Sequence, residues 1–253
     1  MLFGFWVDNH DVRLSEDAPT LVRAAPAEHY TRWRQAHPGF SPIAGREPVI
    51  LVAASGGGIR AAYWTAANLA EMDALPGFGD NLFAISGVSG GSLGAATFTA
   101  LRHAPGSDRS QALGARVRGV LGSDFLSPVV AGLLFPDLAQ RFLPFTVRAA
   151  DRQRFLELSW EEALGTSVGE APNPFSRAFT ELYALPQGPA LPSLLLNATL
   201  VDSGRRAIVS NLDVRGFTDT LDLLAPDVST HRILLSAAAG ASARFTYVSP
   251  AGR

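Results

Sequence analysis

Cysteine and lysine are both absent from this chain of 253 residues. Without cysteine, thiol nucleophiles, disulfides and thiolate metal sites are excluded, and the redox compartment is not indicated. Without lysine, a serine–lysine dyad, a Schiff base and a P-loop lysine are excluded as well. We attribute the exclusive use of arginine to the codon usage of the source genome rather than to function.

Strong charge and long apolar runs are also lacking. The formal net charge is −2 and the sequence pI is about 6.2, so we expect no nucleic acid partner. No stretch reaches the ~18 uninterrupted apolar residues of a membrane span, and the apolar opening Met1–Trp6 is too short for a signal peptide. We expect a cytoplasmic or membrane-associated protein. Those six residues are compatible with the end of a longer segment that attaches the chain to upstream membrane spans.

The hydrophobic content of 47% is sufficient for one main folded domain. Residues 1–47 are polar beyond the opening and interrupted by prolines, with one helix expected near Glu28–Gln35. They are predicted to be an N-terminal extension or linker. The composition changes at Pro48, so residues 48–253 are predicted to form the domain.

Two strand–turn–helix units follow Pro48. The continuous apolar run Val49–Ala54 is typical of a strand buried on both faces, and the alanine-rich run Ile59–Leu75 predicts a helix. Leu82–Ser86 and Ser92–Arg102 repeat this pattern. The order indicates an α/β domain with a largely parallel sheet, and it brings both turns to one edge, where they can face a single crevice.

The segment Gly122–Phe145 is apolar but interrupted by three prolines, which predicts short helices rather than one long helix. We interpret its large apolar residues as core, with a mobile apolar cap over a lipid site as the alternative. These residues are Leu126, Val129, Val130, Leu133, Leu134 and Phe135. Further predicted elements are a helix over Arg152–Leu164, strands over Leu194–Val201 and Ala207–Ser210 joined across Asp202–Arg205, and a helix over His231–Ala243.

The first turn, Ser55–Arg60, contains three successive glycines. The N–H groups of Gly56, Gly57 and Gly58 are uncovered by side chains and can converge on an anion. Arg60 opposes the helix dipole, which suggests a nearby anion, although a solvated surface arginine is the alternative. The pattern also fits a dinucleotide-binding turn. That interpretation needs an acidic residue at the end of the next strand, and this strand leads into a serine turn instead.

The second turn presents Ser89 between Gly87 and Gly91, in a Gly-x-Ser-x-Gly pattern. The flanking glycines allow a sharp bend from strand to helix, which is the setting of a serine nucleophile. The positive end of the helix dipole would favour its alkoxide. The alternative is a serine that only caps the helix.

Together the two turns resemble those of the patatin-like phospholipase family, related in catalytic layout to cytosolic phospholipase A2. The likeness rests on Ser55–Ala61 and Gly87–Ser92, which lie only about thirty residues apart. It extends from about Pro48 to the end of the sequence, where Ser242–Phe245 and Ser249–Gly252 also resemble the family. It implies a three-layer α/β/α domain with a mostly parallel central sheet. It also implies a lipid acyl hydrolase that acts on lipid or phospholipid esters, with peripheral membrane contact and no metal or organic cofactor.

The resemblance also implies roles for individual residues. Ser89 would be the nucleophile, Gly56, Gly57 and Gly58 the oxyanion hole, and Arg60 a ligand for a substrate anion. The family's base is an aspartate in an Asp-Gly-Gly or Asp-Gly-Ala motif, and this sequence has no Asp-Gly pair. We therefore expect the aspartate to lie beyond residue 253, in a domain that is incomplete at its C-terminus, and the chain as given to hydrolyse esters poorly.

Two alternatives stay open. One is an esterase of the α/β-hydrolase type, with a triad of Ser89, Asp213 or Asp222, and His231. The other is a non-catalytic lipid-binding relative that keeps the glycines for packing. Asp202 is not assigned a role, because it lies in a predicted turn between two strands.

Overall fold

The computed structural model describes residues 8–36, 48–104, 113–184, 190–245 and 248–253. The apolar opening Met1–Trp6 and residues 37–47 of the predicted extension lie outside these ranges. The strands are β1 (Ile50–Ala54), β2 (Leu82–Val88), β3 (Ser193–Thr199), β4 (Arg206–Ser210) and β5 (Thr220–Asp222). The longer helices are α1 (Pro26–Ala36), α2 (Gly58–Asp73), α4 (Gly90–His103), α5 (Leu113–Leu121), α6 (Leu126–Gly132), α8 (Arg152–Val168) and α10 (Leu235–Ala243). The shorter ones are α3 (Phe78–Asn81), η1 (Leu133–Asp137), α7 (Leu138–Gln140), η2 (Arg148–Ala150), η3 (Pro174–Ser176), α9 (Phe179–Ala184) and η5 (Ser229–Arg232).

The five strands form one sheet in the order β1-β2-β3-β4-β5. All neighbouring pairs are parallel except β3 and β4, which form an antiparallel hairpin. A mostly parallel α/β sheet with flanking helices is therefore confirmed. Ala54 at the end of β1 lies opposite Gly87 near the end of β2, so both glycine turns emerge at the same edge.

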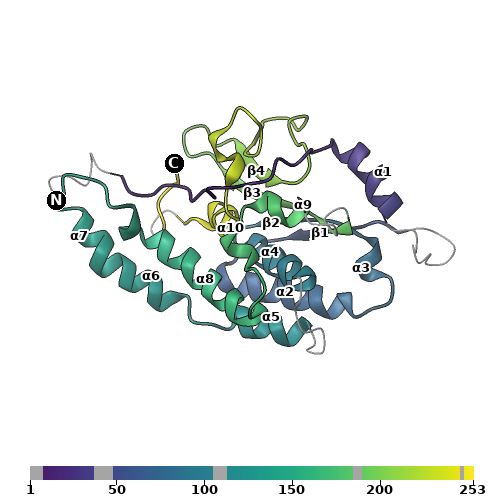
Figure 1. The fold of residues 1–253 in the computed structure, drawn as a ribbon, viewed down its shortest axis with the longest axis horizontal. Helices are drawn as coiled ribbons and strands as arrows, with labels where there is room; N and C mark the ends of the chain where they lie inside the picture. Colours follow the sequence, from purple (N-terminus) through teal and green to yellow (C-terminus); the bar gives the residue numbers. More distant parts are fainter. Residues whose placement is uncertain (1–7, 37–47, 105–112, 185–189, 246–247) are drawn as a thin grey trace.

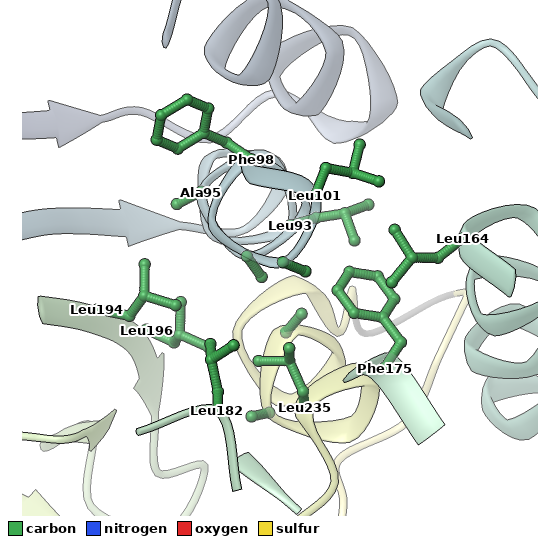
Figure 2. Close-up of a cluster of buried hydrophobic side chains, with 14 of the residues drawn as sticks. Leu93, Ala95, Phe98, Leu101, Leu164, Phe175, Leu182, Leu194, Leu196 and Leu235 are labelled. Atoms are coloured by element: carbon green, nitrogen blue, oxygen red, sulfur yellow. The ribbon is translucent and has the colours of Figure 1, made fainter. Parts of the chain in front are cut away.

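Helices cover one face of the sheet, and α1 lies on the other (Figure 1). Side chains alternate between the faces of a strand, and β3 shows the alternation clearly. Leu194 and Leu196 belong to the large core with α4 and α10, whereas Leu195 packs on the opposite side with Trp33 and Phe83. Figure 2 shows this core around α4, with Leu164, Phe175 and Leu235 on one side of the helix and Phe98 on the other.

The predicted strands and helices of the two strand–turn–helix units are confirmed, with boundaries that shift by a few residues. The expectation that the first strand is buried on both faces is wrong. β1 is an edge strand, and the side chain of Leu51 is 68% exposed. An apolar run cannot distinguish a central strand from an edge strand, because the position in the sheet depends on distant partners.

The segment Gly122–Phe145 contains short helical elements, as predicted, but they are not separated by loops. α6, η1 and α7 follow one another without a break from Leu126 to Gln140, and we call this stretch the helical arm. Pro136 lies inside the π-helical turn η1, whose wider hydrogen-bonding pattern accommodates a residue without an N–H group. The interpretation of the arm's apolar residues as core is wrong for most of them, since Leu126, Val130, Leu134 and Phe135 are exposed and Val129 is buried.

The N-terminal residues 8–36 pack against the rest of the chain. Trp33 of α1 is fully buried against Phe83 of β2, and Arg13 forms an ion pair with Glu161 of α8 at 2.6 Å. The boundary predicted at residue 47 stays a prediction. Near the C-terminus the predicted helix starts later than expected, because η5 and a short extended stretch precede α10.

Candidate active site

Ser89 stands at the sharp bend between β2 and α4. Its backbone has φ 55° and ψ −123°, a conformation that non-glycine residues seldom adopt. Such strain costs about 1–3 kcal/mol and persists where the surrounding structure enforces it, commonly at functional sites. The side chain makes no capping hydrogen bond to α4, so the interpretation of Ser89 as a helix cap is not supported.

Glycines flank Ser89 because the backbone leaves no room for side chains. A Cβ atom on Gly87 would lie 2.6 Å from the backbone nitrogen of Ser92, and one on Gly91 would lie 2.5 Å from the carbonyl oxygen of Ala54. Both separations are shorter than atoms tolerate. The Gly-x-Ser-x-Gly pattern is therefore needed to form this bend between β2 and α4.

The structure brings the first glycine turn against Ser89. A Cβ atom on Gly56 would lie 3.2 Å from Cβ of Ser89 and 3.9 Å from its Oγ. Gly57 and Gly58 have φ values of 148° and 62°, a region that favours glycine, and both are exposed. The turn can thus present bare backbone beside the serine hydroxyl, as the spacing of the two motifs predicts.

The sequence interpretation missed Ser242 as a part of this site. The backbone N–H of Ser89 donates to Oγ of Ser242 at 2.9 Å, and the Ser242 hydroxyl donates to the carbonyl oxygen of Asn197. Ser92 lies 2.8 Å from the same hydroxyl and donates to it, because the Ser242 proton is already used. Ser242 therefore ties the bend to α10 and β3.

Arg60 is exposed in the first turn of α2. Among the residues with described positions, no carboxylate forms an ion pair with it. Its guanidinium is available to an external anion near the glycine turn.

An open hollow of about 820 Å³ adjoins the carboxyl ends of β2 and β3 and is lined in part by Val88, Asn197 and Arg205. Its size is in the range of ligand pockets.

Among the described side chains, no carboxylate or imidazole hydrogen-bonds to Oγ of Ser89. The side chain of His231, the base of the triad alternative, lies outside the described part of the structure. Asp222, one acid of the triad alternative, lies on β5, three strand positions from β2, which corresponds to ~14 Å. Its carboxylate is buried and accepts from Arg23 at 2.7 Å. The structure does not bring Asp222 to Ser89.

Asp213, the other acid of that alternative, follows β4 and pairs with Arg215 at 2.6 Å. Hydrogen bonds from Arg215 lower the pKa of Asp213 to about 2, which makes it a poor general base near neutral pH. His231 lies in η5, and Asp202 lies in the turn between β3 and β4. In the part of the chain that the structure describes, no group of three or more metal-ligating side chains occurs.

No family model matches the chain, and no curated protein matches it. Among solved structures, it is similar to human GIVD cytosolic phospholipase A2 in complex with methyl gamma-linolenyl fluorophosphonate inhibitor and terbium chloride. The match covers 79% of this chain and 30% of that chain, with 16% sequence identity and a TM-score of 0.41. A likeness this distant carries no argument about function. Any functional conclusion must rest on the geometry around Ser89.

Proposed function

We propose that this chain carries the nucleophile and oxyanion hole of a serine-dependent lipid ester hydrolase of patatin-like type. The observation that carries the proposal is the contact between two motifs: Ser89, strained at its bend, adjoins the bare backbone at Gly56. A nucleophile on a sharp turn and backbone donors beside it are the two parts that acyl transfer requires.

In the proposed reaction, Oγ of Ser89 attacks the carbonyl carbon of the ester. The N–H groups of Gly57 and Gly58 stabilise the negative charge that develops on the carbonyl oxygen. A base takes the Ser89 proton and returns it to the alcohol that leaves, and water then releases the fatty acid from the acyl-enzyme. The exposed Arg60 holds the phosphate of a phospholipid substrate.

The base of this proposal is an aspartate beyond residue 253, as the family resemblance implies. The described part of the chain supports this assignment, because Asp222 is bound by Arg23 and Asp213 by Arg215. Without its base, Ser89 stays a neutral hydroxyl of low nucleophilicity. A chain extended past residue 253 is therefore the right protein for the first test.

The test is labelling with a fluorophosphonate, in which Oγ of Ser89 attacks phosphorus and fluoride leaves. We expect the extended chain to be labelled and to hydrolyse a soluble short-chain ester, and Ser89→Ala to lose both. Ser123→Ala, which changes an exposed serine just after α5, is the matched control and should react as the parent does. A folded, extended chain that takes up no label would reject the hydrolase and favour a lipid-binding protein.

A further inference from the structure

The helical arm exposes large apolar side chains along its length and just beyond it. Leu126 and Phe135 are each 71% exposed, and within the arm the exposed Leu126, Val130, Leu134 and Leu138 recur every four residues. The exposed large apolar residues from the arm to its C-terminal turn are Leu126, Val130, Leu134, Phe135, Leu138, Phe142 and Phe145. Monomeric proteins rarely expose so many contiguous large apolar side chains unless the surface binds something. We call this set the apolar stripe.

The charged and amide side chains of the arm are turned away from the apolar stripe, and its exposed hydroxyl, that of Ser127, donates to Asp124 at 2.5 Å. Asp137 is the only charged residue from Leu126 to Gln140, and it is buried in an ion pair with Arg152 of α8. Gln140 is also buried, where it donates to the carbonyl oxygen of Phe145 and accepts from the N–H of Val147. The exposed face of the arm itself therefore carries no charge, and the nearest charged residues in the sequence are Asp124 before the arm and Arg141 after it.

The N-terminus of the described chain meets the end of the stripe. Thr146 donates to the carbonyl oxygen of Asp8 at 3.4 Å, and Arg148 pairs with Asp11 at 2.7 Å. The seven residues that precede Asp8 carry no charge and are mostly large and apolar. This uncharged sequence therefore precedes a residue, Asp8, that lies next to the C-terminal end of the apolar stripe. In Figure 1 the helical arm, labelled α6 and α7, lies at the left, and α3, from which β2 starts, lies at the right.

We propose that the apolar stripe docks on the surface of a lipid bilayer, with the arm lying in the plane of the interface. A typical protein interface surrounds its apolar core with a polar, hydrogen-bonding rim, whereas the stripe consists of hydrocarbon side chains alone. A lipid surface accepts the hydrocarbon side chains of the stripe without hydrogen-bond partners. Docking would bring the proposed hydrolase to its lipid substrate. This inference therefore rests in part on the proposed function.

The arm is too short to span the bilayer. By length and composition, the stretch Leu113–Gln140 would qualify as a membrane span. Its first part is α5, in which Val117 and Val120 are buried in the core, so only the arm is free to contact lipid. Fifteen helical residues extend ~22 Å, against ~30 Å of bilayer hydrocarbon. An interfacial position, with one face in lipid, fits these dimensions.

The test is co-sedimentation with vesicles of pure phosphatidylcholine, whose zero net charge removes the electrostatic attraction of arginine. The protein carries Ser89→Ala, so that binding is measured without hydrolysis and independently of the proposed reaction. We expect it to bind, and the added pair Phe135→Asp and Phe142→Asp to weaken binding by about tenfold per side chain. The control pair, Val22→Asp and Leu75→Asp, changes exposed apolar residues away from the arm and should bind normally.

Several results would overturn the docking proposal while leaving the hydrolase proposal standing. They are absence of vesicle binding by the Ser89→Ala protein, and equal binding by the two substituted proteins. A third is a dimer in sedimentation velocity that the arm substitutions dissociate, without vesicle binding, since the stripe would then join two copies. A fourth is binding that depends on residues 1–7 and not on the arm. Unchanged melting temperatures of the substituted proteins exclude unfolding as the cause of lost binding.

Discussion

At the scale of single residues, Ser89 is held in a strained conformation by a hydroxyl far away in the sequence. The glycines around it are found from the local pattern, because tight turns leave a signature in adjacent residues. Ser242 leaves no such signature. It reaches the Ser89 backbone only because α10 packs beside α4, and one serine in an alanine-rich helix looks like any other.

Ser242→Ala tests this support. The substitution leaves the part-buried N–H of Ser89 and the carbonyl of Asn197 without their partner, which should lower the free energy of unfolding by about 1–3 kcal/mol. It should also slow fluorophosphonate labelling, because the bend is no longer fixed. Denaturant unfolding and labelling rates are the measurements. Ser123→Ala removes an exposed hydroxyl and serves as control, and equal labelling of both variants would contradict the role of Ser242.

At the scale of elements, the site depends on how closely α2 approaches α4. A Cβ atom on Gly94 would lie 2.5 Å from the carbonyl oxygen of Ala62 and 2.8 Å from Cβ of Thr65. Small residues at the crossing let the two helices meet, and both helices begin at the turns that form the candidate site. Their separation therefore sets the distance between the oxyanion glycines and Ser89.

Replacing glycine by alanine at two helical positions should have opposite effects. Gly94→Ala overfills the crossing and should destabilise the fold by about 1–3 kcal/mol, despite the better helix propensity of alanine. Gly119→Ala in α5 has open space around it and should stabilise by about 0.5–1 kcal/mol. Thermal unfolding of both variants provides the comparison. Two shifts of the same sign would show that the crossing is looser than the structure indicates.

The elements that the sequence predicts well are those whose pattern is local. Gly58–Asp73 and Gly90–His103 are alanine-rich and follow glycine turns, so their helices could be recognised. The short strand Thr220–Asp222 was not predicted, because three residues carry no periodicity. The exposure of Phe135 could not be foreseen either. Helical spacing reveals that a face is apolar, but only the fold reveals that no other part of the described chain covers it.

At the scale of the whole molecule, the N-terminal segment links distant parts of the chain. Arg23 forms an ion pair with Asp222 on β5. The backbone N–H of Val12 donates to the carbonyl oxygen of Arg253 at 2.9 Å. Arg13, which lies between Val12 and Arg23 in the sequence, forms an ion pair with Glu161 on α8. These contacts hold one segment against the sheet edge, a helix and the last described residues, so its removal should weaken the domain.

Arg23→Ala measures the strength of this link. Nη1 of Arg23 lies 2.7 Å from the buried carboxylate of Asp222 and also donates to the carbonyl oxygen of Leu212. Loss of the guanidinium leaves a buried carboxylate without its cation, which should lower the free energy of unfolding by about 3–5 kcal/mol. Arg215→Ala is the matched control, because it removes a cation that is 62% exposed and should cost less than about 1 kcal/mol. If both variants lose a similar free energy of unfolding in urea, the Arg23 ion pair contributes no more than a surface charge does. The expected larger loss for Arg23→Ala would show that residues 8–36 are a structural part of the domain.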